Sequence, residues 1–95
     1  MFDRIFFERQ FPDHVQQFCR EQKLAAPVVE LLLDDGTVLR LRAINQTRES
    51  WLSVTVHGER AEARLIFCPY FTIKRITFGS PSSPKDGTFA LAAAP

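Results

Sequence analysis

The sequence predicts an α+β domain that is mainly β, with N-terminal helices and a small five-stranded antiparallel barrel. Short apolar runs of strand length, separated by turn residues, fill residues 28–78. Residues 1–26 instead carry apolar side chains at helical spacing. We therefore predict a single domain over residues 1–78, made of helices in 1–26 and the barrel in 28–78.

Composition sets the scale of this domain but indicates no particular chemistry. The 95 residues suffice for one domain, and nine of them are Phe. So small a domain buries a modest core, which makes oligomerisation a natural source of further burial. Twelve Lys and Arg face eleven Asp and Glu, for a formal net charge of +1. Any nucleic-acid surface must therefore come from local clustering of basic residues.

The N-terminal segment reads as two helices. Phe2, Ile5 and Phe6 share one helical face within residues 1–10, which predicts a short amphipathic helix. Pro12 is expected to interrupt it, because proline disfavours the helical conformation in the residue before it. Proline also suits the first position of a helix, so a second helix is expected from there to about Leu24.

The first two strands form a predicted hairpin. Val28–Leu33 is an apolar run, and Val38–Asn45 alternates leucines with Arg40 and Arg42. The Asp-Gly pair at 35–36 between them is a strong hairpin signal, since its turn type has positive φ at both central residues. The alternation predicts that both arginines point away from the core.

Three further strands follow a polar connection at residues 46–50. We expect strands over Trp51–His57, Ala61–Phe67 and Phe71–Phe78, with Cys68-Pro69-Tyr70 interrupting the last two. The residues expected to face the core are Leu52, Val54 and Val56 in the third strand, and Ala63, Leu65 and Phe67 in the fourth. Residues 79–95 read as a flexible C-terminal tail, which is rich in Gly, Ser and Pro at its start. Its apolar end is expected to be disordered, or docked on a neighbour by Phe89 and Leu91.

The run VVELLLDDGTVLRLRAINQTRESWLSVTV, Val28 to Val56, resembles the first motif of the Sm-like proteins, the small barrels of the Sm, LSm and Hfq families. Gly36 takes the place of the turn glycine, and ARLIFCPYFTIKRITF, Ala63 to Phe78, looks like the second motif. The apolar positions that match are Leu39, Ile44, Leu52 and Val54. The resemblance covers roughly half of the chain. It implies a helix followed by a five-stranded barrel that assembles into rings, in which the fourth strand of one copy pairs with the fifth strand of the next. We therefore predict a barrel of Sm-like or SH3-like kind.

Departures from the Sm-like pattern fall on the residues that bind nucleotides in that family. Thr47 and Trp51 stand where Sm and LSm proteins usually have Asp and Asn, and Leu41 replaces the second glycine. Cys68-Pro69-Tyr70 stands where those proteins have Arg-Gly and Hfq has Tyr-Lys-His. The uridine pocket is therefore not carried over. Another Sm-like relative, the bacterial Rho inhibitor, binds a protein instead, so the function stays open between a protein-interaction regulator and an RNA-binding module.

A group of basic and aromatic residues is the candidate RNA-binding surface. Arg40 and Arg42 could neutralise phosphates while Trp51 stacks on a base, and Arg64 and Lys74 could extend the patch. The alternative is a solvated face whose arginines pair with nearby glutamates. Fluorescence anisotropy with a short RNA at low salt tests the hypothesis, which fails if no binding appears at high micromolar protein.

A second group is the candidate subunit interface: Phe67, Tyr70, Phe71 and Ile73. These apolar residues lie on several faces of the last two predicted strands, more than one small core would take. The alternative is that they pack against the N-terminal helices. In an interface they would cover sheet edges that are otherwise exposed.

No catalytic constellation, metal site or cofactor motif is recognisable. The two histidines, His14 and His57, and the two cysteines, Cys19 and Cys68, lack the spacing of a zinc site. We therefore expect a binding module that is not an enzyme, whose partner is a second copy of itself, RNA or another protein. The free cysteines, the mixed charges near the N-terminus and the lack of a long apolar run predict a cytoplasmic protein without a membrane partner.

Overall fold

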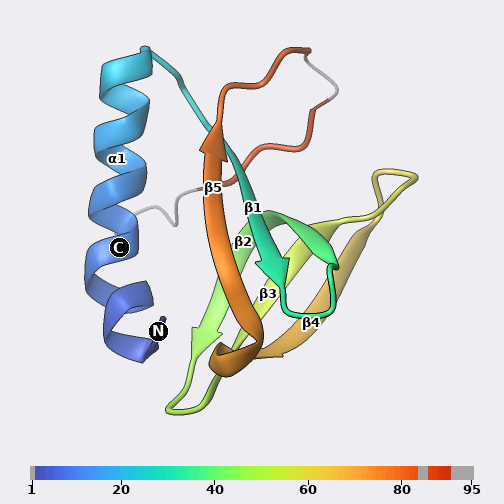
Figure 1. Ribbon diagram of the computed structural model, residues 1–95. Coiled ribbons are helices and arrows are strands. Elements are labelled where there is room, and N and C mark those ends of the chain that lie inside the picture. The colour runs from blue at the N-terminus through green and yellow to red at the C-terminus, as the bar shows by residue number, and fades with distance from the viewer. Residues whose placement is uncertain (1, 84–85, 91–95) are drawn as a thin grey trace.

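One long helix and one bent antiparallel sheet make up the fold of the computed structural model, which describes residues 2–83 and 86–90 (Figure 1). The five strands are ordered β4-β3-β2-β1-β5. They are β1 (Val28–Leu33), β2 (Val38–Thr47), β3 (Trp51–His57), β4 (Ala63–Pro69) and β5 (Ile73–Gly79). The predicted α+β, mainly β class is therefore confirmed. Among the described residues, no helix is long and apolar enough to cross a membrane.

The N-terminal segment is one helix, and the predicted break at Pro12 is wrong. A π-helical turn, η1 (Phe6–Gln10), runs directly into α1 (Phe11–Gln22). The backbone N–H of Phe11 bonds the carbonyl of Phe6, five residues back, so the turn is wider than an α-helical one. Proline normally disrupts a helix through its ring and its missing N–H. Here the helix hydrogen bonds have already changed to the five-residue spacing before the chain reaches Pro12, and the helix continues through this proline.

The predicted hairpin between β1 and β2 is confirmed, but its turn differs from the expected type. Gly36 has φ of 90°, whereas Asp35 is not among the residues with positive φ. The N–H of Gly36 donates to the carbonyl of Leu33 at 3.0 Å. The N–H of Thr37 donates to Asp35 Oδ1 at 2.9 Å, and this bond is the main cause of the lowered pKa of Asp35. The aspartate thus acts as a turn former, with glycine required at a single position.

Strand β2 is where the sheet bends. It pairs with β1 only over Val38–Arg40, and with β3 over Leu41–Thr47. The register with β3 shifts between Leu41 and Ala43 and again between Ile44 and Gln46. Such bulges increase the local twist and let one strand serve two differently oriented parts of a sheet.

Strand β4 faces the opposite way from the prediction. Leu65 and Phe67 are 58% and 61% exposed, whereas Cys68 is 2% exposed. The strand also continues through Pro69 instead of stopping before it. In β3, by contrast, Leu52, Val54 and Val56 are buried as predicted. Because a one-residue change of phase exchanges the two faces of a strand, alternation alone could not decide which face of β4 is inside.

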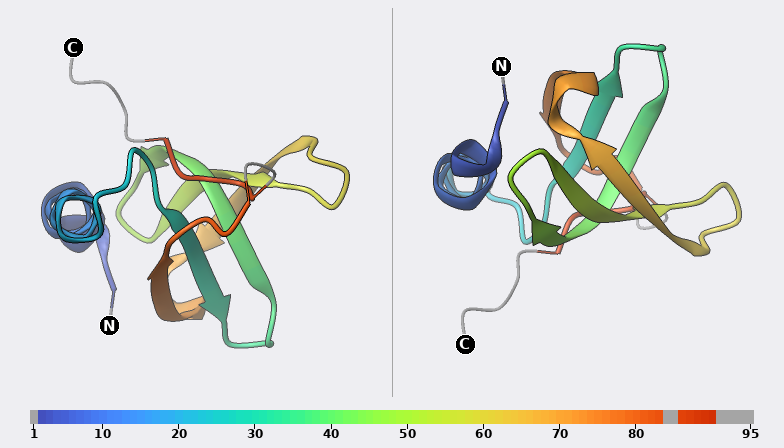
Figure 2. Two further views of the ribbon diagram at one scale, coloured as in Figure 1. Left: turned by 90° about the horizontal axis from the view of Figure 1, so that it is seen from above. Right: turned by 90° about the horizontal axis from the view of Figure 1, so that it is seen from below.

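The sheet stays open, so the predicted closed barrel is not observed. Strands β4 and β5 are the two ends of the strand order. A short 3-10 turn, η2 (Tyr70–Thr72), joins them in sequence, and the fifth strand therefore begins later than predicted. Figure 2 shows α1 on one side of the sheet and the β3–β4 loop projecting on the other.

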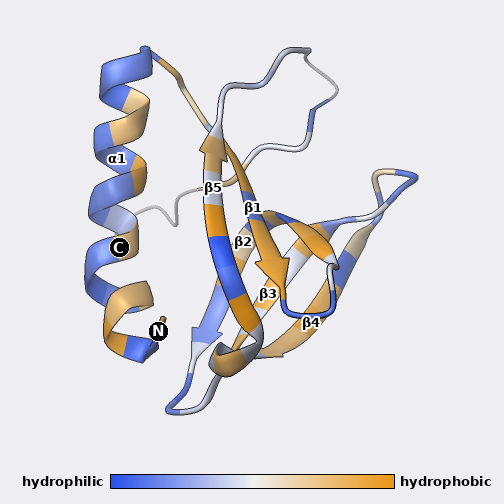
Figure 3. Ribbon diagram, viewed as in Figure 1, coloured by the Kyte–Doolittle hydropathy of each residue, from blue (hydrophilic) through white to orange (hydrophobic). Residues whose placement is uncertain are grey.

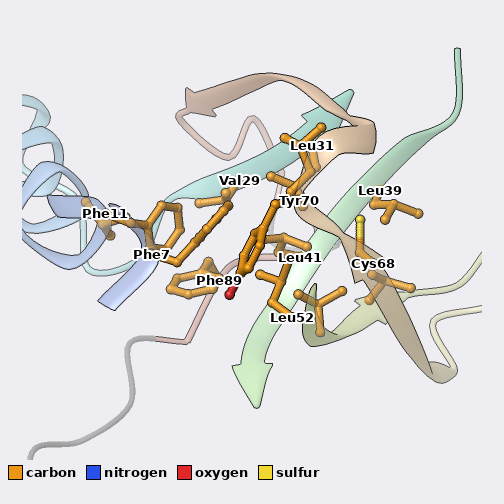
Figure 4. Packing of buried hydrophobic residues seen from close by; sticks show 14 residues of the cluster. Phe7, Phe11, Val29, Leu31, Leu39, Leu41, Leu52, Cys68, Tyr70 and Phe89 are labelled. Carbon is orange, nitrogen blue, oxygen red and sulfur yellow. The ribbon is translucent and has the colours of Figure 1, made fainter. Parts of the chain in front are cut away.

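The core fills the space between the helix and the inner face of the sheet. Figure 3 shows the apolar part of α1 on the side nearer the sheet. The buried cluster, drawn as sticks in Figure 4, comprises Phe7, Phe11, Val15, Val29, Leu31, Leu39, Leu41, Leu52, Val54, Val56, Cys68, Tyr70, Ile73 and Phe89. The ring of Phe11 has Phe7, Phe89 and Phe78 at centroid distances of 5.6, 5.4 and 5.8 Å. Aromatic rings thus connect the helix to the sheet.

Part of the predicted flexible tail belongs to this core. Residues 86–90, here called the C-terminal strap, cross the sheet so that Phe89 is only 4% exposed. The strap is held by N–H donation from Phe89 to the Pro27 carbonyl and from Ala90 to the Arg42 carbonyl, each at 2.8 Å. His57 Nε2 lies 3.0 Å from the carbonyl of Thr88. Phe89 therefore docks on its own molecule, while Leu91 lies outside the described residues.

Candidate functional site: the open edge of strand β4

The backbone of β4 presents unpaired groups at the edge of the sheet. Two bonds fix the phase of its ladder with β3: Gly58 N–H to the Glu62 carbonyl at 2.7 Å, and Tyr70 N–H to the Ser50 carbonyl at 3.1 Å. Residues of an antiparallel strand point their N–H and C=O groups alternately toward one neighbour and away from it. The even-numbered residues of β4 therefore bond to β3. Odd-numbered residues, including Leu65 and Phe67, direct their backbone groups outward.

The same residues expose apolar side chains. Phe67 lies opposite Ser53 in the ladder, and Leu65 lies opposite Thr55, so their side chains share the outer face of β3 and β4. The rings of Phe67 and Trp51 meet edge to face, with centroids 5.4 Å apart. An edge strand with free backbone groups and large apolar side chains is a surface that another strand can join.

Pro69 fits the edge position of β4. Its ring nitrogen has no proton, and its position in the ladder is one whose N–H would point outward. Proline is accepted in sheets where its missing donor faces solvent. The proline that led us to expect an interruption is therefore compatible with the strand, because β4 has a single neighbour in the described sheet.

The predicted interface group divides into exposed and buried residues. Phe67 and Phe71 are 61% and 70% exposed, whereas Tyr70 and Ile73 are 4% and 7% exposed. The Tyr70 hydroxyl donates to the carbonyl of Arg48 at 2.7 Å, and its ring stacks on Phe7 with centroids 5.8 Å apart. Burial raises the pKa of Tyr70. Tyr70 and Ile73 are therefore core residues, and Tyr70 packs against the N-terminal helix, as the alternative explanation held.

The inner face of β4 is equally part of the core. Cys68 lies with its Sγ 3.5 Å from Thr72 Oγ1, and burial raises the pKa of its thiol. Cys19 on α1 is partly buried, and burial raises its pKa as well. Both cysteines are free. Raised pKa values disfavour thiolates, so neither cysteine resembles an activated nucleophile.

The candidate RNA-binding residues lie far apart in the sheet. Arg40 is next to Leu41, which pairs with Val56 near the end of β3, whereas Trp51 begins β3. At about 3.3 Å per residue these two side chains are on the order of 20 Å apart along the sheet. Arg40 also forms a part-buried ion pair with Glu30 at 3.2 Å. Its charge is thus already partly compensated within the molecule.

The remaining cationic candidates occupy separate strands. Arg42 lies at the first bulge of β2, Arg64 on β4 and Lys74 on β5, and all three are exposed. Since β4 and β5 are opposite ends of the strand order, these residues do not share one ladder. RNA binding by this group stays a prediction.

Several hollows open on the surface of the described residues, and two of them border strand β2. A cleft of about 450 Å³ lies among Glu30, Arg40, His57 and Gly87, and mixes both signs of charge. A second, of about 370 Å³, is apolar and lies between α1 and β2, beside Phe89. No group of three or more His, Cys, Asp or Glu side chains positioned to hold a metal ion occurs within residues 2–83 and 86–90. The open edge of β4 is therefore the candidate functional site.

Comparison with known proteins adds no relative. The sequence matches no protein-family model, and neither the curated proteins nor the solved structures contain a match to it. The assignment of the site consequently rests on its own geometry. Sequence reasoning named Phe67 but placed Leu65 and Phe67 inside. Pro69 was the signal that could have identified β4 as an edge strand.

Proposed function

We propose that this protein is a non-catalytic, Sm-like binding module that self-associates through the open edge of β4. The observation that supports the proposal is the combination of outward backbone groups and exposed apolar side chains at Leu65 and Phe67. A lone monomer would leave these groups solvated next to a hydrophobic strip, which is a known hazard for aggregation. Pairing with another strand satisfies the backbone groups and buries the side chains together.

The Sm-like assignment of this proposal has its own support. An N-terminal helix precedes five antiparallel strands, and the two unpaired strands are the fourth and fifth. Those are the strands through which Sm-like subunits join. The open sheet thus leaves the edge of β4 for a partner to cover.

Protein contact is favoured over RNA contact at this site. Trp51, Phe67 and Leu65 form an uncharged surface, while binding to a phosphate backbone depends on cations. The competing class, a regulator that offers the same edge to a different protein, uses the same groups. In that case the isolated chain would be a monomer, whereas self-association predicts an oligomer.

The experiment is a native-mass measurement on matched variants. Light scattering after size exclusion is expected to give an oligomer for the wild type and a monomer for Phe67→Glu. A carboxylate at this position would have to be buried between β4 and its partner strand, which is unfavourable for a charged group. Ile5→Glu is the control, since Ile5 is 59% exposed but belongs to the N-terminal helix and not to β4.

Circular dichroism verifies that both variants keep their strand content. Wild-type protein that is monomeric at high micromolar concentration would contradict self-association. An oligomer that persists in Phe67→Glu would place the interface elsewhere.

A further inference from the structure

We infer that the partner of β4 is the β4 strand of a second copy, paired antiparallel about a twofold axis at Ile66. This inference rests on the proposed function and names the partner at the same site. It differs from the arrangement that the Sm-like resemblance implies, in which β4 would pair with β5. The choice between these partners follows from the charges and side chains of the two edges.

Charge disfavours β5 as the partner strand. The single charged residue of β4 is Arg64, and the charged residues of β5 are Lys74 and Arg75. All three are cationic and exposed, and β5 contains no acidic residue to offset them. Exposed lysines are a common means by which sheet edges are kept from pairing. Strand β5 thus has the character of a protected edge, while β4 does not.

The two edges also differ in what covers them. The ring of Phe78 on β5 lies 5.8 Å from Phe11 and 5.8 Å from Phe18, so the helix packs against this side of the sheet. The β4 side faces away from the helix (Figure 2). A second copy can therefore approach β4 without displacing α1.

One register matches the side chains of two β4 strands best. With the axis at Ile66, Leu65 of each copy lies opposite Phe67 of the other, and Ile66 lies opposite itself. Leu65 and Phe67 both direct their backbone groups outward, so each such pair is a hydrogen-bonded pair. Aromatic and aliphatic residues directly opposite each other stabilise a ladder.

The same register keeps the charges apart. Arg64 lies opposite Cys68 of the second copy, so the two arginines are separated by four residues along the ladder. At about 3.3 Å per residue that separation is roughly 13 Å, which exceeds the screening length of about 8 Å at physiological salt. The alternative axis at Leu65 would instead place Phe67 opposite Ala63, which buries less apolar surface.

Cysteine crosslinking tests the axis directly. Under mild oxidation, Ile66→Cys is expected to form a covalent dimer, because residues on the axis have Cα atoms about 4.5 Å apart, within disulfide range. Leu65→Cys is the matched control, since its diagonal distance to its own copy exceeds about 7 Å. The wild type, with its own two cysteines, controls for other crosslinks.

A charge exchange tests the register without cysteines. Leu65→Lys and Phe67→Glu each remove apolar pairs, and each is expected to raise the dissociation constant of the dimer by roughly tenfold or more. The double variant L65K/F67E places Lys opposite Glu twice and should recover part of that loss. An axis at Leu65 would place Lys opposite Lys and give no recovery.

The outcomes separate this inference from the proposed function. A monomeric wild type overturns both. A wild-type dimer in which Leu65→Cys crosslinks and Ile66→Cys does not overturns the register, and a hexamer or heptamer overturns the twofold pairing while leaving self-association in place.

Discussion

The two edges of this sheet are built differently, although they are joined by a turn of only three residues. Strand β5 has Lys74 and Arg75 exposed on it, and its Phe78 packs against the helix. Strand β4 exposes Leu65 and Phe67, and its inner face holds Cys68 in the core. The helix therefore covers the β5 side of the sheet within the molecule, whereas β4 exposes apolar side chains of the kind found in interfaces.

The difference has a simple physical origin. The described part of the chain has one long helix, which packs on the β5 side of the sheet (Figures 1 and 2). Aromatic residues there find partners inside the molecule. On the β4 side there is no second element to cover the strand among the described residues, so its outer apolar residues stay exposed.

The largest expected effect is on the free energy of unfolding, when a ring is removed from the side of the sheet that the helix covers. Phe11→Ala removes the ring that meets Phe7, Phe78 and Phe89, and should lower the free energy of unfolding by about 3–5 kcal/mol. Urea denaturation followed by circular dichroism measures it. The control is Phe71→Ala, which removes an equally large ring that is 70% exposed and should change the unfolding free energy of the monomer by about 0.5 kcal/mol or less. Equal losses of unfolding free energy in the two variants would contradict the difference between the covered and the exposed side of the sheet.

A smaller effect is expected at the turn that joins the two edges. Tyr70→Phe removes the hydroxyl that donates to the Arg48 carbonyl, while keeping the ring stacked on Phe7. One net hydrogen bond is worth about 1 kcal/mol, so the unfolding free energy should fall by that amount. Tyr70→Leu also removes the stacked ring and should cost more. A Phe variant as stable as the wild type would show that the bond contributes nothing.

The smallest perturbation is chemical labelling of the native thiols, which tests whether the inner face of β4 is closed. Burial raises the pKa of both cysteines, so both should react slowly with a disulfide reagent at pH 8. Cys68, at 2% exposure, should react roughly tenfold more slowly than the partly exposed Cys19, or slower still, because its labelling requires local opening. Similar labelling rates would mean that the inner face of β4 opens readily enough to expose Cys68 as much as Cys19.

Local patterns predicted much of the fold because they depend on neighbouring residues. The hairpin at Gly36, the strand at Trp51–His57 with its inward Leu52, Val54 and Val56, and the N-terminal helical segment all follow from spacing and turn chemistry. The candidate site was predicted less well. Phe67 and Phe71 were named as interface residues, but they were grouped with Tyr70 and Ile73, which are buried.

The sequence by itself determined the elements, their order and the apolar residues available to a core, since these depend on periodicities of two and 3.6 residues. Only the tertiary structure decided which face of β4 turned inward, that Pro12 could remain within a helix, and that Phe89 returned to the core. Those outcomes depend on contacts between residues far apart in the chain. A strand with apolar residues on both faces has no local preference between them, and its neighbours make the choice.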